Sequence, residues 1–172
     1  EDVAAVVDSA PSEQLLSAPA IDAYEIAEPV RVLERLPANY SELLQSASWK
    51  ERKEALDALL PVLRVPRIED GRYGELAALL GKRVAVDPNV LVVTAAANCL
   101  EALAAGLRAS FSPYRSEAVA ALLERCKERK PTVVEALRAA LTAIIPSVSS
   151  LADILADLSS AVRQQRNPQV KA

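Results

Sequence analysis

A single tryptophan and a set of cations and amides stand at or just before the starts of the helices that the sequence predicts. They are Trp49, Lys50, Asn89, Val90, Arg129, Lys130, Arg166 and Asn167. None of these side chains is a ready nucleophile or general base, whereas tryptophan and arginine are the residues that most often anchor protein contacts. The residue types therefore suggest binding rather than catalysis.

The composition excludes most enzyme classes. The 172 residues contain no histidine, which removes the commonest general base, the usual zinc ligand and the catalytic Ser-His and Cys-His pairs. No phosphate-binding glycine loop or metal-spaced carboxylate cluster is visible. We expect no catalytic residue, no cofactor and no metal, and an enzyme is the third of three alternatives.

The charge, length and cysteines limit the class further. A net charge of -3 gives no reason to expect nucleic acid or an anionic membrane as a partner, and no uninterrupted apolar run approaches the roughly 20 residues that span a bilayer. The length suits one domain, which we expect to be monomeric. Cys99 and Cys126 are predicted to be reduced thiols, largely buried on an inner and an outer helix respectively. Because the sequence begins with Glu1 and lacks methionine, we interpret it as a piece of a larger protein.

Hydrophobic periodicity and breaks predict an all-α chain. Residues 1–20 are expected to be a flexible tail or linker, followed by a domain over 21–172 that opens with a packed segment at 21–36. The predicted helices cover 39–47, 49–64, 72–86, 88–108, 114–128, 131–145 and 149–165. Ser48 with Glu51 predicts a capping box, and Pro88, Pro131 and Pro168 suit the first helical position.

A repeated tripeptide gives the architecture. Pro-x-Val recurs at residues 88, 131 and 168, and a period of about 40 residues is typical of an array of helix pairs. Each pair would have an outer helix, a tight turn and an inner helix, and would bury its apolar face against its neighbours. The sequence therefore predicts an α-solenoid of HEAT type. The nearly all-apolar stretch at 90–107 should be its central helix.

The turns within these pairs should line up along one edge. Trp49 is open to two interpretations, a ring that caps the core or a largely exposed anchor with Arg52 and Lys53 as polar surroundings. Lys130 occupies a cap position that Asp87 and Asn167 would fill better, at a cost of about 0.5–2 kcal/mol. It is either a functional cation or a solvated lysine without a role. The alternating charges at 124–130 are expected to be a solvated helix face.

At these turns the sequence resembles a TOG domain of the microtubule polymerase family, most closely the second of its TOG domains. The resemblance rests on Ser-Trp-Lys-Glu-Arg-Lys-Glu-Ala-Leu at 48–56, Asp-Pro-Asn-Val at 87–90, Lys-Pro-Thr-Val at 130–133 and Asn-Pro-Gln-Val at 167–170. The lead-in at 24–33 is also similar. The resemblance covers about residues 22–172. The array stops just inside the fourth inner helix, so the fold is expected to be incomplete at the C-terminus.

The resemblance implies a function and a site. TOG domains are arrays of six HEAT-like repeats that bind curved αβ-tubulin through their turns, in the cytoplasm at microtubule plus ends, spindles and organising centres. By position, Trp49 matches the anchor on β-tubulin, Asn89 and Val90 the second turn, Lys130 the third and Asn167 the fourth. The competing interpretation is a passive HEAT scaffold that docks a peptide or helical protein on its helix faces.

Overall fold

Helices account for nearly all regular structure in the computed structural model, which describes residues 22–164. The main helices are α2 (Tyr40–Gln45), α3 (Trp49–Leu63), α4 (Gly74–Val86), α5 (Val90–Leu107), α6 (Arg115–Glu124), α7 (Pro131–Ile144) and α8 (Leu151–Gln164). Short helical turns are α1 (Ala23–Ile26), η1 (Val32–Arg35), η2 (Arg108–Tyr114) and η3 (Ile145–Ser147). Each of the seven predicted helices is present and lies inside its predicted range. The expected tail at 1–20 lies outside the described residues.

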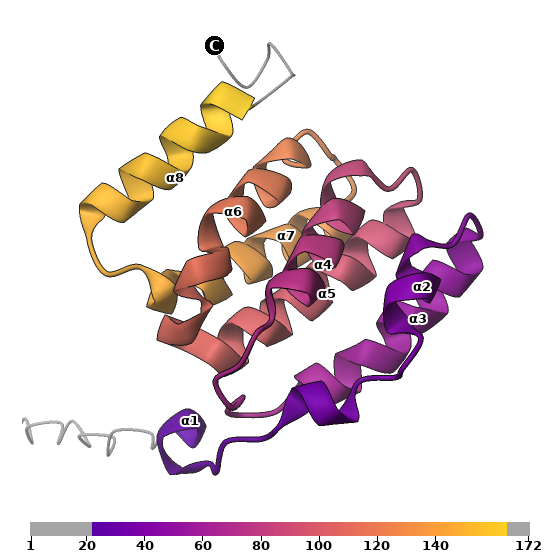
Figure 1. Ribbon diagram of the computed structural model, residues 1–172. Coiled ribbons are helices and arrows are strands. Elements are labelled where there is room, and N and C mark those ends of the chain that lie inside the picture. The colour runs from indigo at the N-terminus through magenta and orange to yellow at the C-terminus, as the bar shows by residue number, and fades with distance from the viewer. Residues whose placement is uncertain (1–21, 165–172) are drawn as a thin grey trace, which may run out of the picture.

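The main helices form two layers of a solenoid. In one layer α5 lies between α3 and α7, and in the other α4 contacts both α2 and α6, which in turn contacts α8. The pairs α2–α3, α4–α5 and α6–α7 join the layers. The turns inside these three pairs lie along the same edge of the molecule, at the upper right of Figure 1. The predicted α-solenoid of helix pairs is confirmed.

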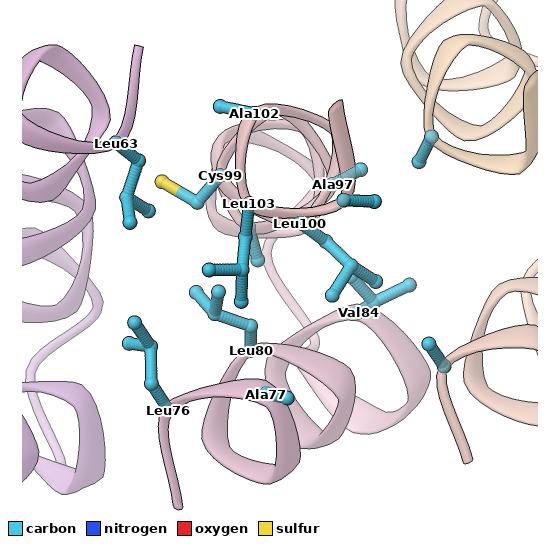
Figure 2. Close-up of a cluster of buried hydrophobic side chains, with 14 of the residues drawn as sticks. Leu63, Leu76, Ala77, Leu80, Val84, Ala97, Cys99, Leu100, Ala102 and Leu103 are labelled. Atoms are coloured by element: carbon cyan, nitrogen blue, oxygen red, sulfur yellow. The ribbon is translucent and has the colours of Figure 1, made fainter. Parts of the chain in front are cut away.

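Helix α5 is the centre of the core, as its composition predicts. Figure 2 shows Leu100 and Leu103 of α5 among Leu76 and Leu80 of α4, with Leu63 of α3 beside them. All five are essentially inaccessible to solvent. Within the described residues the helical stretch Val90–Glu124 is long and apolar enough to cross a membrane, but 67% of its most apolar window is buried inside the protein. Its hydrophobicity is that of a helix covered by α3, α4 and α7.

The segment before α2 is fastened to the opposite edge from the turns. Val30 pairs with the 67–69 loop through two backbone hydrogen bonds, and the amide of Ile68 donates to the carbonyl of Gly106 at 2.9 Å. Val32 is fully buried, as expected of a packed segment, but Ile26 is 74% exposed. The packing of this segment is therefore carried by its second half.

Two predicted helix starts are wrong in detail. Ser48 precedes α3 without a side-chain capping bond, because Glu51 bonds the hydroxyl of Ser46 instead. That hydroxyl accepts the amide of Ser48 at 3.0 Å. Helix α5 begins at Val90 rather than at Pro88, because the Asn89 side chain caps it by accepting the Leu91 amide at 2.9 Å. Pro131 is the first residue of α7, as predicted.

Half of the cysteine prediction is also wrong. Cys99 is fully buried on α5, and this burial raises the pKa of its thiol to about 12. Cys126 is free but exposed, and it follows the last residue of α6 rather than lying within that helix. The helix ends at Glu124, so the residues predicted to extend it form part of a longer turn. We expect a thiol reagent to label Cys126 in the native state and Cys99 only upon unfolding.

Mass spectrometry after brief native labelling tests this expectation, with Cys126→Ser as the control that should abolish native labelling. Rapid native labelling of Cys99 would show that α5 is not packed as described.

Two helical glycines provide a second prediction about packing. A methyl group at Gly106 would lie 2.5 Å from Cγ1 of Ile68, whereas one at Gly81 would make an ordinary 3.5 Å contact with Ala121. Alanine gains about 1 kcal/mol over glycine in a helix, while overpacking costs about 1–3 kcal/mol. In denaturant titrations we therefore expect Gly81→Ala to be the more stable of the two alanine variants by about 1–3 kcal/mol. Equal stabilities would mean that the loop around Ile68 does not press on α5.

Candidate protein-binding edge

The predicted site residues within the described chain come together on three turns, which we call the turn edge. The turn edge consists of residues 46–50, 87–90 and 125–130, at the junctions of α2–α3, α4–α5 and α6–α7. It contains Trp49, Lys50, Asn89, Val90, Arg129 and Lys130. The other two predicted residues, Arg166 and Asn167, lie outside the described residues.

The exposure of Trp49 is intermediate between the two interpretations of the sequence, a ring that caps the core and a largely exposed anchor. Trp49 is the first residue of α3, and its side chain is 40% exposed, so it is neither a core residue nor mostly in solvent. Trp49 lines a shallow groove of about 440 Å³ together with Ala47, Arg52, Pro88, Asn89 and Val90. The first and second turns therefore form one surface, with the indole partly embedded beside the second turn.

Beneath this surface lies a buried ion pair. The side chain of Asp87 is fully inaccessible, and that of Arg52 is 6% exposed. Arg52 donates from Nε and Nη2 to the two carboxylate oxygens of Asp87, at 2.8 and 3.1 Å. Its third nitrogen, Nη1, donates to the carbonyls of Ser46 and Ala47 at 2.7 and 3.0 Å. One guanidinium thus binds the backbone of the first turn and the carboxylate of the second.

Two further arginines reach the same aspartate. Arg83 Nη1 lies 3.5 Å from the carboxylate of Asp87. Arg125 Nη2 donates to the backbone carbonyl of Asp87 at 3.1 Å and also pairs with Glu128. The Nε groups of Arg83 and Arg125 are buried without an acceptor among the described residues. The network therefore connects all three turns.

These contacts correct three predictions from the sequence. Asp87 is not the cap of α5 but the buried partner of Arg52, and its carboxylate accepts the Asn89 amide at 3.0 Å. Arg52 is buried rather than exposed, although it does line the groove beside Trp49. Arg125 is also buried, so the alternating charges at 124–130 are not simply a solvated face. The network was missed because Arg52 and Asp87 are 35 residues apart, and no local pattern links them.

Other cations of the turn edge point outward. Lys50, Arg129 and Lys130 are exposed, and their side chains make no hydrogen bond or ion pair within residues 22–164. Lys130 precedes α7 without a capping bond, as predicted, and so places a positive charge at the positive end of the helix dipole. The outer surface of the turn edge therefore carries three positive charges without an acidic neighbour among the described residues.

We next considered whether the described residues could form a catalytic or metal site. In the described part of the chain no three histidine, cysteine, aspartate or glutamate side chains are grouped so as to hold a metal ion. A second groove, of about 320 Å³, is lined by residues of α6, α7, η3 and α8 and is mostly apolar. Its lining includes Leu141, Ile145, Ile154 and Leu158. It is the feature that a helix-face docking scaffold would use.

The chain is similar in sequence and in structure to spindle and microtubule proteins. No protein-family model matches the sequence. The chain is 46% identical over 154 residues to the spindle pole body component alp14 of Schizosaccharomyces pombe, covering 90% of this chain and 19% of that protein. It is 40% identical over 156 residues to the protein mini spindles of Drosophila melanogaster, covering 88% and 7%. The chain thus spans a small part of the length of these relatives.

Two solved structures share the fold. One, from work on microtubule plus end tracking by XMAP215, CLIP-170 and EB1, is 41% identical with a TM-score of 0.74, covering 84% of this chain and 59% of that chain. The other, from work on tubulin recruitment and assembly by microtubule polymerases with TOG domain arrays, is 31% identical with a TM-score of 0.74, covering 86% and 30%. With the relatives above, these likenesses identify the chain as a TOG domain of the microtubule polymerase family.

Proposed function

We propose that this chain binds the αβ-tubulin heterodimer through its turn edge and prefers the curved, unpolymerised form. The observation that carries the proposal is the position of Trp49, a partly exposed ring on an edge whose outward cations have no partner among the described residues. Such an edge suits an acidic globular protein, because the cations accelerate encounter and the aromatic anchor slows release. One structural neighbour comes from a study of tubulin recruitment.

A preference for one tubulin shape would follow from rigidity. The three turns are linked by buried hydrogen bonds to Asp87, so their spacing is fixed before a partner arrives. A rigid turn edge would fit one curvature of tubulin better than another. A binding protein favours one conformation of its partner only if it binds that conformation more tightly. We include Arg166 and Asn167 in this proposal as binding residues of a fourth turn. We also propose that the domain extends over residues 21–172.

The cellular role proposed for the larger protein is microtubule polymerisation at plus ends, spindles and organising centres. The names of the relatives point to spindles, spindle pole bodies and centrosomes. We propose a binding role with no catalytic step for this chain. Its correspondence to the second TOG domain of the family remains part of the proposal.

A helix-face scaffold is the second candidate, because four large apolar side chains among the described ones of α8 are exposed. They are Leu151, Ile154, Leu155 and Leu158. Size-exclusion co-elution with soluble tubulin separates the two candidates when single alanine variants on the turn edge and on α8 are compared. Loss of tubulin binding from α8 rather than from the turn edge would favour the scaffold.

Replacement of the tryptophan is the first test. We expect Trp49→Ala to lose about 2 kcal/mol or more of tubulin binding, about 30-fold in Kd, because the ring is the anchor. Its unfolding free energy should fall by only about 1 kcal/mol, since the side chain is already partly in solvent. Ile154→Ala is a matched control, because Ile154 is also 40% exposed but lies on α8. A loss of several kcal/mol in stability for Trp49→Ala would make Trp49 a core residue.

Reversal of a turn-edge charge is the second test. Lys130→Glu should weaken tubulin binding and reduce its salt dependence, because it removes a screened attraction to an acidic partner. The unfolding free energy should hold or rise by a few tenths of a kcal/mol, since an acid suits the start of α7. Arg138→Glu makes the same charge change at an exposed position within α7. Equal affinities for Lys130→Glu and wild type at low ionic strength would show that the third turn does not touch tubulin.

A further inference from the structure

We propose that Thr132 is a phosphorylation site for a serine/threonine kinase that recognises basic residues, and that a phosphate there switches off tubulin binding at the third turn. The inference rests on the proposed function, because it regulates the same turn edge. Thr132 is the second residue of α7 and is exposed. Its hydroxyl makes no hydrogen bond to another residue within 22–164. The side chain is therefore available for modification.

Two cations precede Thr132 at a spacing that such kinases read. Arg129 lies three residues before the threonine and Lys130 two residues before it, and two adjacent cations in this register before a serine or threonine occur once in the sequence. Both are exposed and unpaired within the described residues. Lys130 has extended backbone angles, φ -67° and ψ 123°, which a residue before proline favours. An acidic substrate groove can therefore bind this stretch by charge complementarity.

The first turn of α7 is poorly stabilised, which favours the local opening that a kinase needs. Val133 is fully buried, so this turn must open before the neighbouring threonine can reach a kinase active site. Among the seven main helices within residues 22–164, only α7 lacks both a side-chain capping bond and an acid in its first turn. Lys130 at its cap adds an unfavourable charge. Helix ends of this kind open at small cost.

A phosphate on Thr132 would supply the negative charge that this helix start lacks. It carries about -1.5 to -2 charges at pH 7, and a negative group in the first turn of a helix is favourable. Arg129 and Lys130 are close in sequence and unpaired, so they can donate charge-assisted hydrogen bonds to the phosphate oxygens. The phosphorylated domain should thus be at least as stable as the unmodified one.

The same phosphate opposes the binding of an acidic partner in two ways. It offsets about half or more of the three positive charges that Lys50, Arg129 and Lys130 give the turn edge. It also engages the two cations of the third turn, which then no longer attract tubulin. Phosphorylation should therefore lower the affinity for tubulin without lowering the stability of the domain.

The phosphoryl transfer requires MgATP and the kinase. The hydroxyl oxygen of Thr132 attacks the γ-phosphorus of ATP, and the new O–P bond forms as the bond from that phosphorus to the β–γ bridging oxygen breaks. ADP leaves, and the hydroxyl proton passes to the catalytic aspartate of the kinase.

The opposite edge of the molecule contains a matched control. Ser110 follows Arg108 by two residues, a spacing that also suits a kinase of this class. The guanidinium of Arg108 is already engaged, because it pairs with Asp22 at 2.6 Å and its central carbon lies 4.1 Å from the centroid of the Tyr24 ring. We therefore expect the kinase to modify Thr132 and to leave Ser110 unmodified.

The experiment treats the 172-residue chain and its Thr132→Val variant with the catalytic subunit of cyclic-AMP-dependent protein kinase and MgATP. Mass spectrometry locates the phosphate, and Tm and the Kd for soluble tubulin are measured before and after treatment. In the wild type we expect a phosphate on Thr132, an unchanged or higher Tm and about tenfold or more weaker binding at low ionic strength. Added salt should reduce this loss. Treatment should change neither Tm nor Kd of Thr132→Val.

Three results would overturn the proposal: no phosphate on Thr132, equal phosphorylation of Ser110, or an unchanged Kd once Thr132 is fully phosphorylated. A lower Tm together with weaker binding would also overturn it, because the affinity would then be lost through disruption of the third turn. Failure of the proposed function would appear differently, as a lack of tubulin binding by the untreated wild type. The switch would then fail with it, while mass spectrometry and Tm would still decide whether Thr132 is the phosphorylation site.

Discussion

The burial of α5 is the constraint on which the rest of the structure depends. Apolar residues cover most of its circumference, so leaving most of its surface in water would carry a large hydrophobic cost. The stripe of Leu91, Thr94, Asn98, Glu101 and Ala105 is exposed or partly exposed. Two neighbours in its own layer and one helix of the other layer provide the cover. A two-layer stack of helix pairs satisfies this requirement, and the same stacking brings the turns of successive pairs to a common edge.

The edges of such a stack face a different requirement, because the turns expose backbone carbonyls that need donors. At both edges a buried arginine meets this need, Arg52 at the first turn and Arg115 at the opposite edge, each paired with an aspartate from another helix pair. The buried charges connect neighbouring repeats, while Lys50, Arg129 and Lys130 remain outside. One set of cations thus lies beneath the turn edge, bound to its backbone and to Asp87, and another lies on its outer surface.

The helices and their stacking follow from local features of the sequence. Apolar spacing, prolines at the breaks and the recurring Pro-x-Val predicted all seven main helices and the two-layer array, because these features act within one or two turns of a helix. The placement of Trp49 at the start of α3 followed in the same way. The resemblance of the turn motifs to TOG domains added the family, which the relatives support.

Only the tertiary structure decided which polar side chains are buried. From the sequence alone Asp87 is a good helix cap and Arg52 a surface cation, yet across 35 residues they form the ion pair beneath the turn edge. Cys126 is exposed because α6 ends before it, beside an arginine drawn inward to the Asp87 carbonyl. Helix propensity is local and can be read along the chain, whereas burial of a charge depends on a partner that the fold brings from another repeat.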